Sequence, residues 1–267
     1  MATKKDEAQS TEVAATEQNA LQGMMIAPSE DENKLPEHVR NSTGAGNDNV
    51  DASDMLIPRI KLLQSLSPEL DQTKPSYLPG AKSGQFLNTN TQELFDELYL
   101  VNLFYEHMYC VFKKRKLGGG FKGAFPTLAE AQTAIEEMCK TDDELMPQML
   151  ETIETARHTL LTINPRTGKM EPAVMDLTST KLQVSRAWNT NINRYGGDRF
   201  AGIWKMASAS VTNTKGTFFN IAVQFVGYLN DELYAGAKEK YQQIRGAIDS
   251  GSVTHGDEEE SEAAKQA

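Results

Sequence analysis

Both ends of this 267-residue chain are acidic and lack aromatic residues, so a hydrophobic core has to form between them. Residues 1–54 carry 4 basic and 11 acidic side chains, and residues 249–267 contain the acidic cluster Asp257 to Glu260. Segments of this kind bury too little apolar surface to offset the entropy that ordering costs. We therefore predict disordered acidic segments at 1–54 and 249–267, flanking a single folded domain at 55–248.

The net charge of -10 hides a slightly basic middle. Residues 55–245 hold 22 basic and 20 acidic side chains, a net charge of +2, so the acidity belongs to the two ends. Such asymmetry indicates a polyanionic partner for the middle or an acidic interaction tail, although a merely solvated tail explains the same composition.

Composition excludes several classes of protein. The two cysteines, Cys110 and Cys139, are too few for a disulfide scaffold or a four-cysteine zinc site, and they suit a reducing cytoplasm. No window approaches the roughly 18 consecutive apolar residues that a spanning helix needs. The N-terminal sequence MATKKDEAQSTEV lacks the apolar core of a secretory signal. We expect a cytoplasmic protein without membrane contact.

Strand and helix patterns alternate through the middle of the chain. Residues 98–112 (LYLVNLFYEHMYCVF) are dense in aromatic and β-branched residues and give the strongest strand signal. Thr127 and Glu130 form a capping box at the start of a helix over 127–139. Further strands are predicted at 84–87, 151–163, 172–177, 199–210 and 217–228, further helices at 179–192 and 231–248, and a glycine-rich loop at 113–126. The fold class is therefore α+β: a curved antiparallel sheet, of which an OB-like barrel is one form, with two to three helices.

Catalytic motifs are weak. The run GGGFKG at 118–123 lacks the lysine and Ser or Thr that a phosphate-binding P-loop requires after its last glycine, because Ala124 and Phe125 follow Gly123. His107 and Cys110 lie three apart in a predicted strand and so face opposite sides of it. We predict a protein that is not an enzyme and that uses no metal ion or other cofactor.

Basic and aromatic residues cluster in two stretches, 111–126 and 181–219. Single-stranded nucleic acid is held by this pairing, because cations follow the phosphates while flat rings stack on exposed bases. The predicted nucleic-acid-binding residues are Lys113, Lys114, Arg115, Lys116, Phe121, Lys122, Lys181, Arg186, Arg194, Tyr195, Arg199, Trp204, Lys205 and Lys215.

Each stretch also has a purely structural interpretation. Lys113 to Lys116 suit a solvated hairpin tip, and aromatic residues in strands more often belong to a core than to a stacking surface. Phe219, Phe225 and Trp188 are expected in the core on this ground. Arg186, Arg194 and Arg199 are placed to pair with the acidic residues of 128–154 instead of a ligand.

Five segments resemble a group of tailed-bacteriophage proteins, some of them described as single-stranded DNA-binding proteins. They are IPRIKLLQSLSPEL (57–70), SGQF (83–86), MDLTSTKLQVSRAWNTNI (175–192), DRFAGIWKM (198–206) and KGTFFNIAVQFVG (215–227). The resemblance spans most of 55–228 and implies an accessory protein of replication or recombination that coats single strands, with an OB-like barrel. Its motif positions include Lys181, Arg186, Trp188, Arg199, Trp204 and Lys215. The chain departs from many single-strand binders at its end, AAKQA, which lacks the aromatic residue that docks partner proteins.

These observations predict sequence-tolerant, non-enzymatic binding of single-stranded DNA in phage replication or recombination, in the host cytoplasm. The acidic tail is expected to compete with DNA for the basic groove, and it is a candidate docking segment for phage replication proteins; an oligomer is compatible with the sequence. The alternative is a phage assembly or host-takeover factor that binds no nucleic acid. A nuclease requires clustered metal-binding carboxylates near the basic stretch, and only Asp176 and Asp198 are close in sequence.

Overall fold

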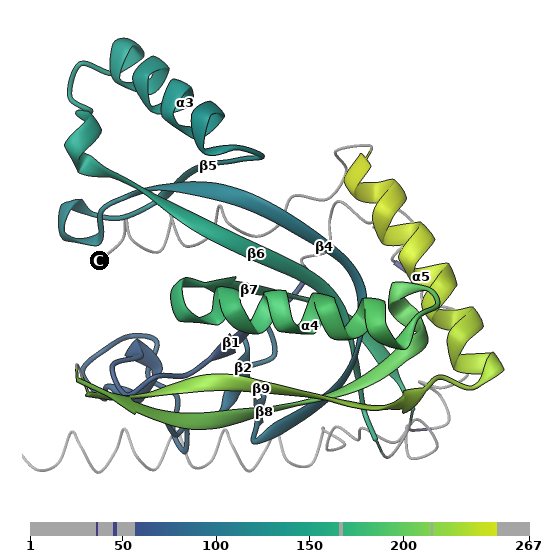
Figure 1. The fold of residues 1–267 in the computed structure, drawn as a ribbon. Helices are drawn as coiled ribbons and strands as arrows, with labels where there is room; N and C mark the ends of the chain where they lie inside the picture. Colours follow the sequence, from purple (N-terminus) through teal and green to yellow (C-terminus); the bar gives the residue numbers. More distant parts are fainter. Residues whose placement is uncertain (1–35, 37–44, 47–56, 166–167, 215, 250–267) are drawn as a thin grey trace, which may run out of the picture. The chain divides into compact units, whose positions relative to one another are not determined.

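The computed structural model describes residues 36, 45–46, 57–165, 168–214 and 216–249 (Figure 1). The chain divides into a first unit, Met1–Asn49, and a second unit, Val50–Ala267, and every helix and strand described below belongs to the second. The predicted acidic end segments lie almost entirely outside the described residues.

A six-stranded antiparallel sheet forms the framework of the second unit. Its path is β7 (Met170–Thr178), β6 (Leu150–Ile163), β4 (Glu97–Lys113), β8 (Gly202–Asn213) and β9 (Gly216–Tyr228), with β5 (Phe121–Phe125) paired to β4. β4 pairs with β6 along nearly its whole length, whereas its other edge is shared by β8 and β5. The strand path is open, so the predicted α+β class and antiparallel sheet are confirmed, without closure into a barrel.

A second, three-stranded antiparallel sheet consists of β1 (Ile60–Leu62), β2 (Phe86–Asn88) and β3 (Leu94–Phe95). It joins the large sheet at β7, where the Val174 N–H donates to the Pro58 carbonyl at 2.9 Å. A 3-10 turn, Pro68–Leu70, lies in the connection between β1 and β2. Phe86 and Leu62 are buried and extend the main core into this sheet.

Three α-helices cover the large sheet: α3 (Leu128–Thr141), α4 (Leu182–Tyr195) and α5 (Asp231–Asp249). Because successive strand residues face opposite sides, β4 supplies both faces of the sheet. Leu100 packs in one core cluster with Trp188 of α4, while Val101 packs in another with Tyr241 of α5. α3 closes a third, smaller cluster against Val111, beyond the end of α4 (Figure 1).

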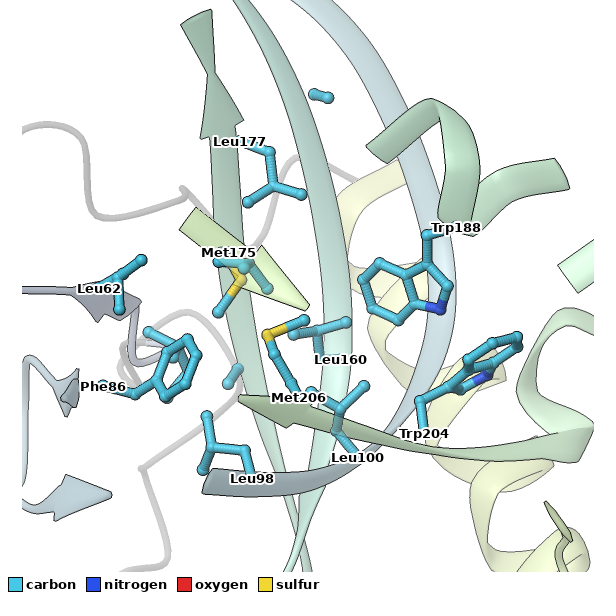
Figure 2. Close-up of a cluster of buried hydrophobic side chains, with 14 of the residues drawn as sticks. Leu62, Phe86, Leu98, Leu100, Leu160, Met175, Leu177, Trp188, Trp204 and Met206 are labelled. Atoms are coloured by element: carbon cyan, nitrogen blue, oxygen red, sulfur yellow. The ribbon is translucent and has the colours of Figure 1, made fainter. Parts of the chain in front are cut away.

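The main core contains both tryptophans of the chain (Figure 2). Trp188 from α4 and Trp204 from β8 meet edge to face, with ring centroids 6.0 Å apart. Alternate residues of β9 face this core, because Ile221 is buried and Phe219, Val223 and Phe225 pack against the same cluster.

Three predicted elements differ in detail. The 113–126 segment is only partly a loop, because Arg115–Leu117 form a 3-10 turn and β5 pairs back onto β4 through Phe121 and Phe125. The strand predicted from 199 begins at Gly202, since Arg199–Ala201 form a 3-10 turn. In the capping box, Thr127 Oγ1 accepts the Glu130 N–H at 3.2 Å, but the Glu130 carboxylate takes the Thr127 hydroxyl rather than the backbone amide.

Candidate nucleic-acid interface

The β4–β5 hairpin ends in a basic tip, which we define as residues 113–122. Lys114, Arg115, Lys116 and Lys122 are exposed, and among the described residues none of them forms an ion pair. Unpaired and hydrated cations of this kind are available to phosphates at low desolvation cost. The tip is thus the most accessible group of predicted binding residues.

Backbone geometry explains the glycines of the tip. Gly118, Gly119 and Gly120 all have φ between 67° and 116°, in the left-handed region that residues with a side chain avoid. They let the chain reverse so that the Lys113 N–H donates to the Gly120 carbonyl at 2.8 Å. At the base of the tip Phe112 and Phe121 meet edge to face at 5.5 Å, and both are half-buried.

Helix α4 presents a polar stripe to solvent, opposite its buried face. Ser185, Trp188 and Ile192 are buried, whereas Arg186, Thr190 and Arg194 are exposed at a spacing of four residues. No residue of α4 is acidic. The stripe therefore offers two guanidiniums and several neutral hydrogen-bonding groups without a competing negative charge of its own.

Arg186 already has a partner, as the sequence allowed. Its Nη2 lies 3.2 Å from Glu154 Oε1 on β6, and His107 Nε2 contacts the same oxygen at 3.1 Å. The hydrogen bond from His107, with the charge of Arg186, lowers the pKa of the Glu154 carboxyl. An exposed pair of this kind contributes little stability.

A groove of about 540 Å³ lies between this pair and the start of α4. Ser179, Thr180 and Gln183 line it with Glu154 and Arg186. Ser179 has φ +53°, an uncommon value for a residue with a side chain, and such strain concentrates at binding sites. Glu154 in the groove pairs with Tyr109 of β4, and the basic tip begins four residues further along that strand, at Lys113.

An exposed aromatic cluster stands at the far end of α4, which we define as Tyr195, Phe225 and Tyr228. Tyr195 and Phe225 are stacked with centroids 3.9 Å apart, and Tyr228 meets Phe225 edge to face at 5.1 Å. Tyr195 is 43% exposed and Tyr228 is 56% exposed, so both rings are accessible. The Tyr228 hydroxyl donates to the Tyr195 carbonyl at 2.7 Å and ties β9 to the helix.

Sequence reasoning identified only Tyr195 of this cluster. Phe225 was expected in the core and does pack against it, but its contact with Tyr195 was not predicted, and Tyr228 was not singled out, because strand periodicity does not show where a helix end will meet a sheet edge. The β-bulge that shifts the β8–β9 register next to Trp204 was the missing information.

Two predicted binding residues are not exposed. Trp204 is only 2% exposed, so its ring is not available to stack on a base, and we correct this assignment. Arg199 is half-buried, and its Nε donates to Asn102 Oδ1 at 2.6 Å and its Nη2 to Asn189 Oδ1 at 2.5 Å. It therefore does not belong to the exposed cations of the basic tip and the α4 stripe.

The remaining predicted residues have individual outcomes. Lys205 is paired with Glu97 at 2.5 Å, and this hydrogen bond raises the pKa of the lysine. Lys181 is half-buried before α4, and burial lowers its pKa. Lys113 is half-buried at the base of the tip. Lys215 lies outside the described residues.

The described part of the chain contains no group of three or more His, Cys, Asp or Glu side chains placed to hold a metal ion. His107 is exposed and Cys110 is buried, in keeping with the opposite faces expected for them. Asp176 serves structure: its carboxylate binds Arg157 at 2.9 Å and also contacts Arg59. No described helix has the length and apolar content needed to cross a membrane.

Comparison with known protein families gives a match over most of the chain. A family model described as "Pam3 phage gp34-like protein" matches residues 29–248, which is most of the chain. Neither a curated protein nor a solved structure matches.

Proposed function

We propose that this chain, which belongs to the Pam3 phage gp34-like protein family and is a bacteriophage protein, binds single-stranded DNA for the phage. The binding is sequence-tolerant and non-enzymatic, and it serves phage DNA replication or recombination. The observation that carries the proposal is the basic tip, whose exposed cations Lys114, Arg115, Lys116 and Lys122 have no ion-pair partner among the described residues.

The path proposed for the strand begins at the tip, follows the groove and the α4 stripe, and ends at the aromatic cluster. Its length follows from element geometry. Lys113 lies four strand residues beyond Tyr109, which pairs with Glu154 beside Arg186, and Arg186 lies nine helical residues before Tyr195. At about 3.3 Å per strand residue and 1.5 Å per helical residue, the path measures roughly 25–30 Å.

Cations and rings have separate tasks along this path. The tip and Arg194 attract phosphates at any sequence, and the attraction weakens with salt. Tyr195 and Tyr228 offer ring faces to bases, which are accessible only in a single strand, at about 1–3 kcal/mol per stacked base. The proposal therefore requires a preference for single strands over duplex.

The direct test is fluorescence anisotropy of the full chain with a labelled 30-mer, single-stranded or duplex, at several salt concentrations. Single-strand binding that weakens log-linearly with salt and exceeds duplex binding at each concentration supports the proposal. Absence of binding at low salt refutes it, and it favours the alternative of a phage assembly or host-takeover factor, which a pull-down of partner proteins then tests.

A further inference from the structure

Strand β4 has an uncovered stretch between its two neighbours on one edge. β8 pairs with β4 only as far as Val101, and β5 begins to pair at Tyr109, so residues 102–108 have no strand partner on that side in the described sheet. The 3-10 turn Arg199–Ala201 and helix α5 approach this gap instead. A pocket of about 440 Å³ lies here, between β4, the turn and α5. This volume falls within the range of small-molecule sites.

Arg199 lines the pocket and carries a charge that no carboxylate neutralises. Its guanidinium binds the neutral amides of Asn102 and Asn189, and among the described residues it forms no ion pair. Its third neighbour, His158, lies 3.5 Å from Nη2. Burial, and then the charge of Arg199, lowers the His158 pKa to about 3, so the imidazole is neutral.

The neutral partners also fix the orientation of the guanidinium. Asn102 Nδ2 donates to His158 Nδ1 at 2.9 Å, which leaves the proton on Nε2 to be donated to Ser185 Oγ at 2.8 Å. The Tyr105 ring lies 5.5 Å from the Arg199 guanidinium carbon. A partly desolvated cation held in place by neutral groups is a preorganised site for an anion.

Further groups of the pocket define the class of anion. Lys238 from α5 adds a second cation, and Tyr105 and Tyr241 add aromatic walls. The pocket also contains one carboxylate, Asp198, which accepts the Tyr234 hydroxyl at 2.5 Å. Two cations, one carboxylate and four aromatic side chains, since Phe104 and Phe200 also line the pocket, match an anion that carries an aromatic group better than a bare inorganic ion.

We propose that this pocket binds the phosphate group of a nucleotide, with the Arg199 guanidinium as the principal donor and Lys238 as the second cation. The inference goes beyond the strand path, which does not pass through the pocket. The bound phosphate can belong to a free mononucleotide or to the phosphorylated end of a DNA strand. The displacement experiment below distinguishes these two sources.

The first experiment titrates the full chain with dAMP and with deoxyadenosine by calorimetry. We expect dAMP to bind at least about ten-fold more tightly, because charge-assisted hydrogen bonds to the phosphate are the stronger contacts. Equal affinities, or no binding of dAMP at millimolar concentration, overturn the proposal.

Variants then locate the site. Lys238→Gln is expected to weaken dAMP binding about two- to five-fold, the range of an exposed charge contact, whereas Lys240→Gln is a matched control two residues along α5 that does not line the pocket. Arg199→Gln is expected to lower the affinity by about ten-fold or more. If Arg199→Gln fails to fold, the comparison of Lys238→Gln with Lys240→Gln still tests the site. Equal dAMP affinities of these two variants contradict the proposal.

Displacement of bound dAMP identifies the source of the phosphate. Displacement by a 5′-phosphorylated 30-mer but not by its 5′-hydroxyl form assigns the pocket to a strand end, and no displacement by either assigns it to a free nucleotide. Equal displacement by both means that dAMP occupies the strand path, and this overturns the proposal. Binding of dAMP without any strand binding refutes the proposed function alone.

Discussion

Neutralising the basic tip gives the most quantitative prediction. In the triple variant Lys114→Ala, Arg115→Ala, Lys116→Ala, three exposed cations without ion-pair partners among the described residues are removed. Each phosphate contact on a single strand contributes about −0.7 to the slope of log K against log salt. If each cation takes one phosphate, the slope becomes shallower by about 2.

This change in slope has a measurable consequence in affinity. Between 200 and 50 mM salt, a slope difference of about 2 means that the wild-type protein gains roughly 20-fold more affinity than the variant. Anisotropy with a labelled single-stranded 30-mer measures both slopes. Because the three side chains are solvated, the thermal unfolding midpoint should stay close to that of the wild type.

A charge-matched control separates local contacts from overall charge. Lys74, Lys82 and Lys140 are also exposed and form no ion pair among the described residues. The variant with these three changed to Ala has the same net charge as the tip variant. Equal slopes for the two triple variants would refute the assignment of the tip as the phosphate-contacting segment.

Four other predictions concern the aromatic cluster, the acidic tail, His158 and Asp176. Tyr228→Ala should weaken single-strand binding at least five-fold through lost stacking, whereas Tyr77→Ala, in a loop remote in sequence, should not; similar losses would remove the aromatic cluster from the path. Deleting residues 250–267 should tighten DNA binding, most at low salt, because an acidic competitor is lost; unchanged affinity would exclude competition by the tail. Because the folded pKa of His158 is about 3, the unfolded state binds more protons than the folded state below its ordinary pKa of about 6.5. The free energy of unfolding therefore has its full His158 contribution above that pH and falls by roughly 2 kcal/mol as the pH is lowered to 5. Urea unfolding should show this fall in the wild type and a smaller fall in His158→Gln. Asp176→Asn should destabilise the fold by about 3 kcal/mol, because it removes the carboxylate charge that binds the buried Arg157 guanidinium at 2.9 Å; a loss below 1 kcal/mol would contradict this.

The Asp176 carboxyl adds a second pH dependence in the same direction, at lower pH. Burial alone would raise its pKa, but Arg157 and Arg59 outweigh burial and hold the pKa below the usual range. A depressed carboxyl pKa stabilises the fold above the ordinary value and loses this contribution as the pH falls through the folded value. The His158 contribution is lost at higher pH than that of Asp176, so acid unfolding separates the two groups.

Periodicity predicted most of the fold because its elements are long. The 17-residue β4, the 14-residue β6 and the α5 helix repeat their apolar spacing often enough to be identified without tertiary information. β5 has only five residues, two of them aromatic. Its half-buried and exposed positions alternate, but because it contains a glycine and a lysine, the sequence did not indicate a strand there. Sheet closure depends on which strands become neighbours, and sequence periodicity does not carry that information.

The candidate site was likewise predictable only in part. Exposed cations in a turn are predictable, since glycines and consecutive lysines do not fit a core, and the basic tip is exposed as composition suggests. Trp204 was misplaced because a basic and aromatic stretch looks the same whether its side chains face solvent or the interior. Its burial depends on α4 lying across the sheet, which is a tertiary fact.

The central claim is that single-stranded DNA follows the path from the basic tip to the aromatic cluster. Photocrosslinking the full chain to single-stranded 30-mers that carry 5-iododeoxyuridine, followed by peptide mapping, tests it most directly. We predict crosslinks within residues 112–122 and at Tyr195, Phe225 or Tyr228. Crosslinks confined to other segments, such as α3, or no crosslink at low salt would contradict it.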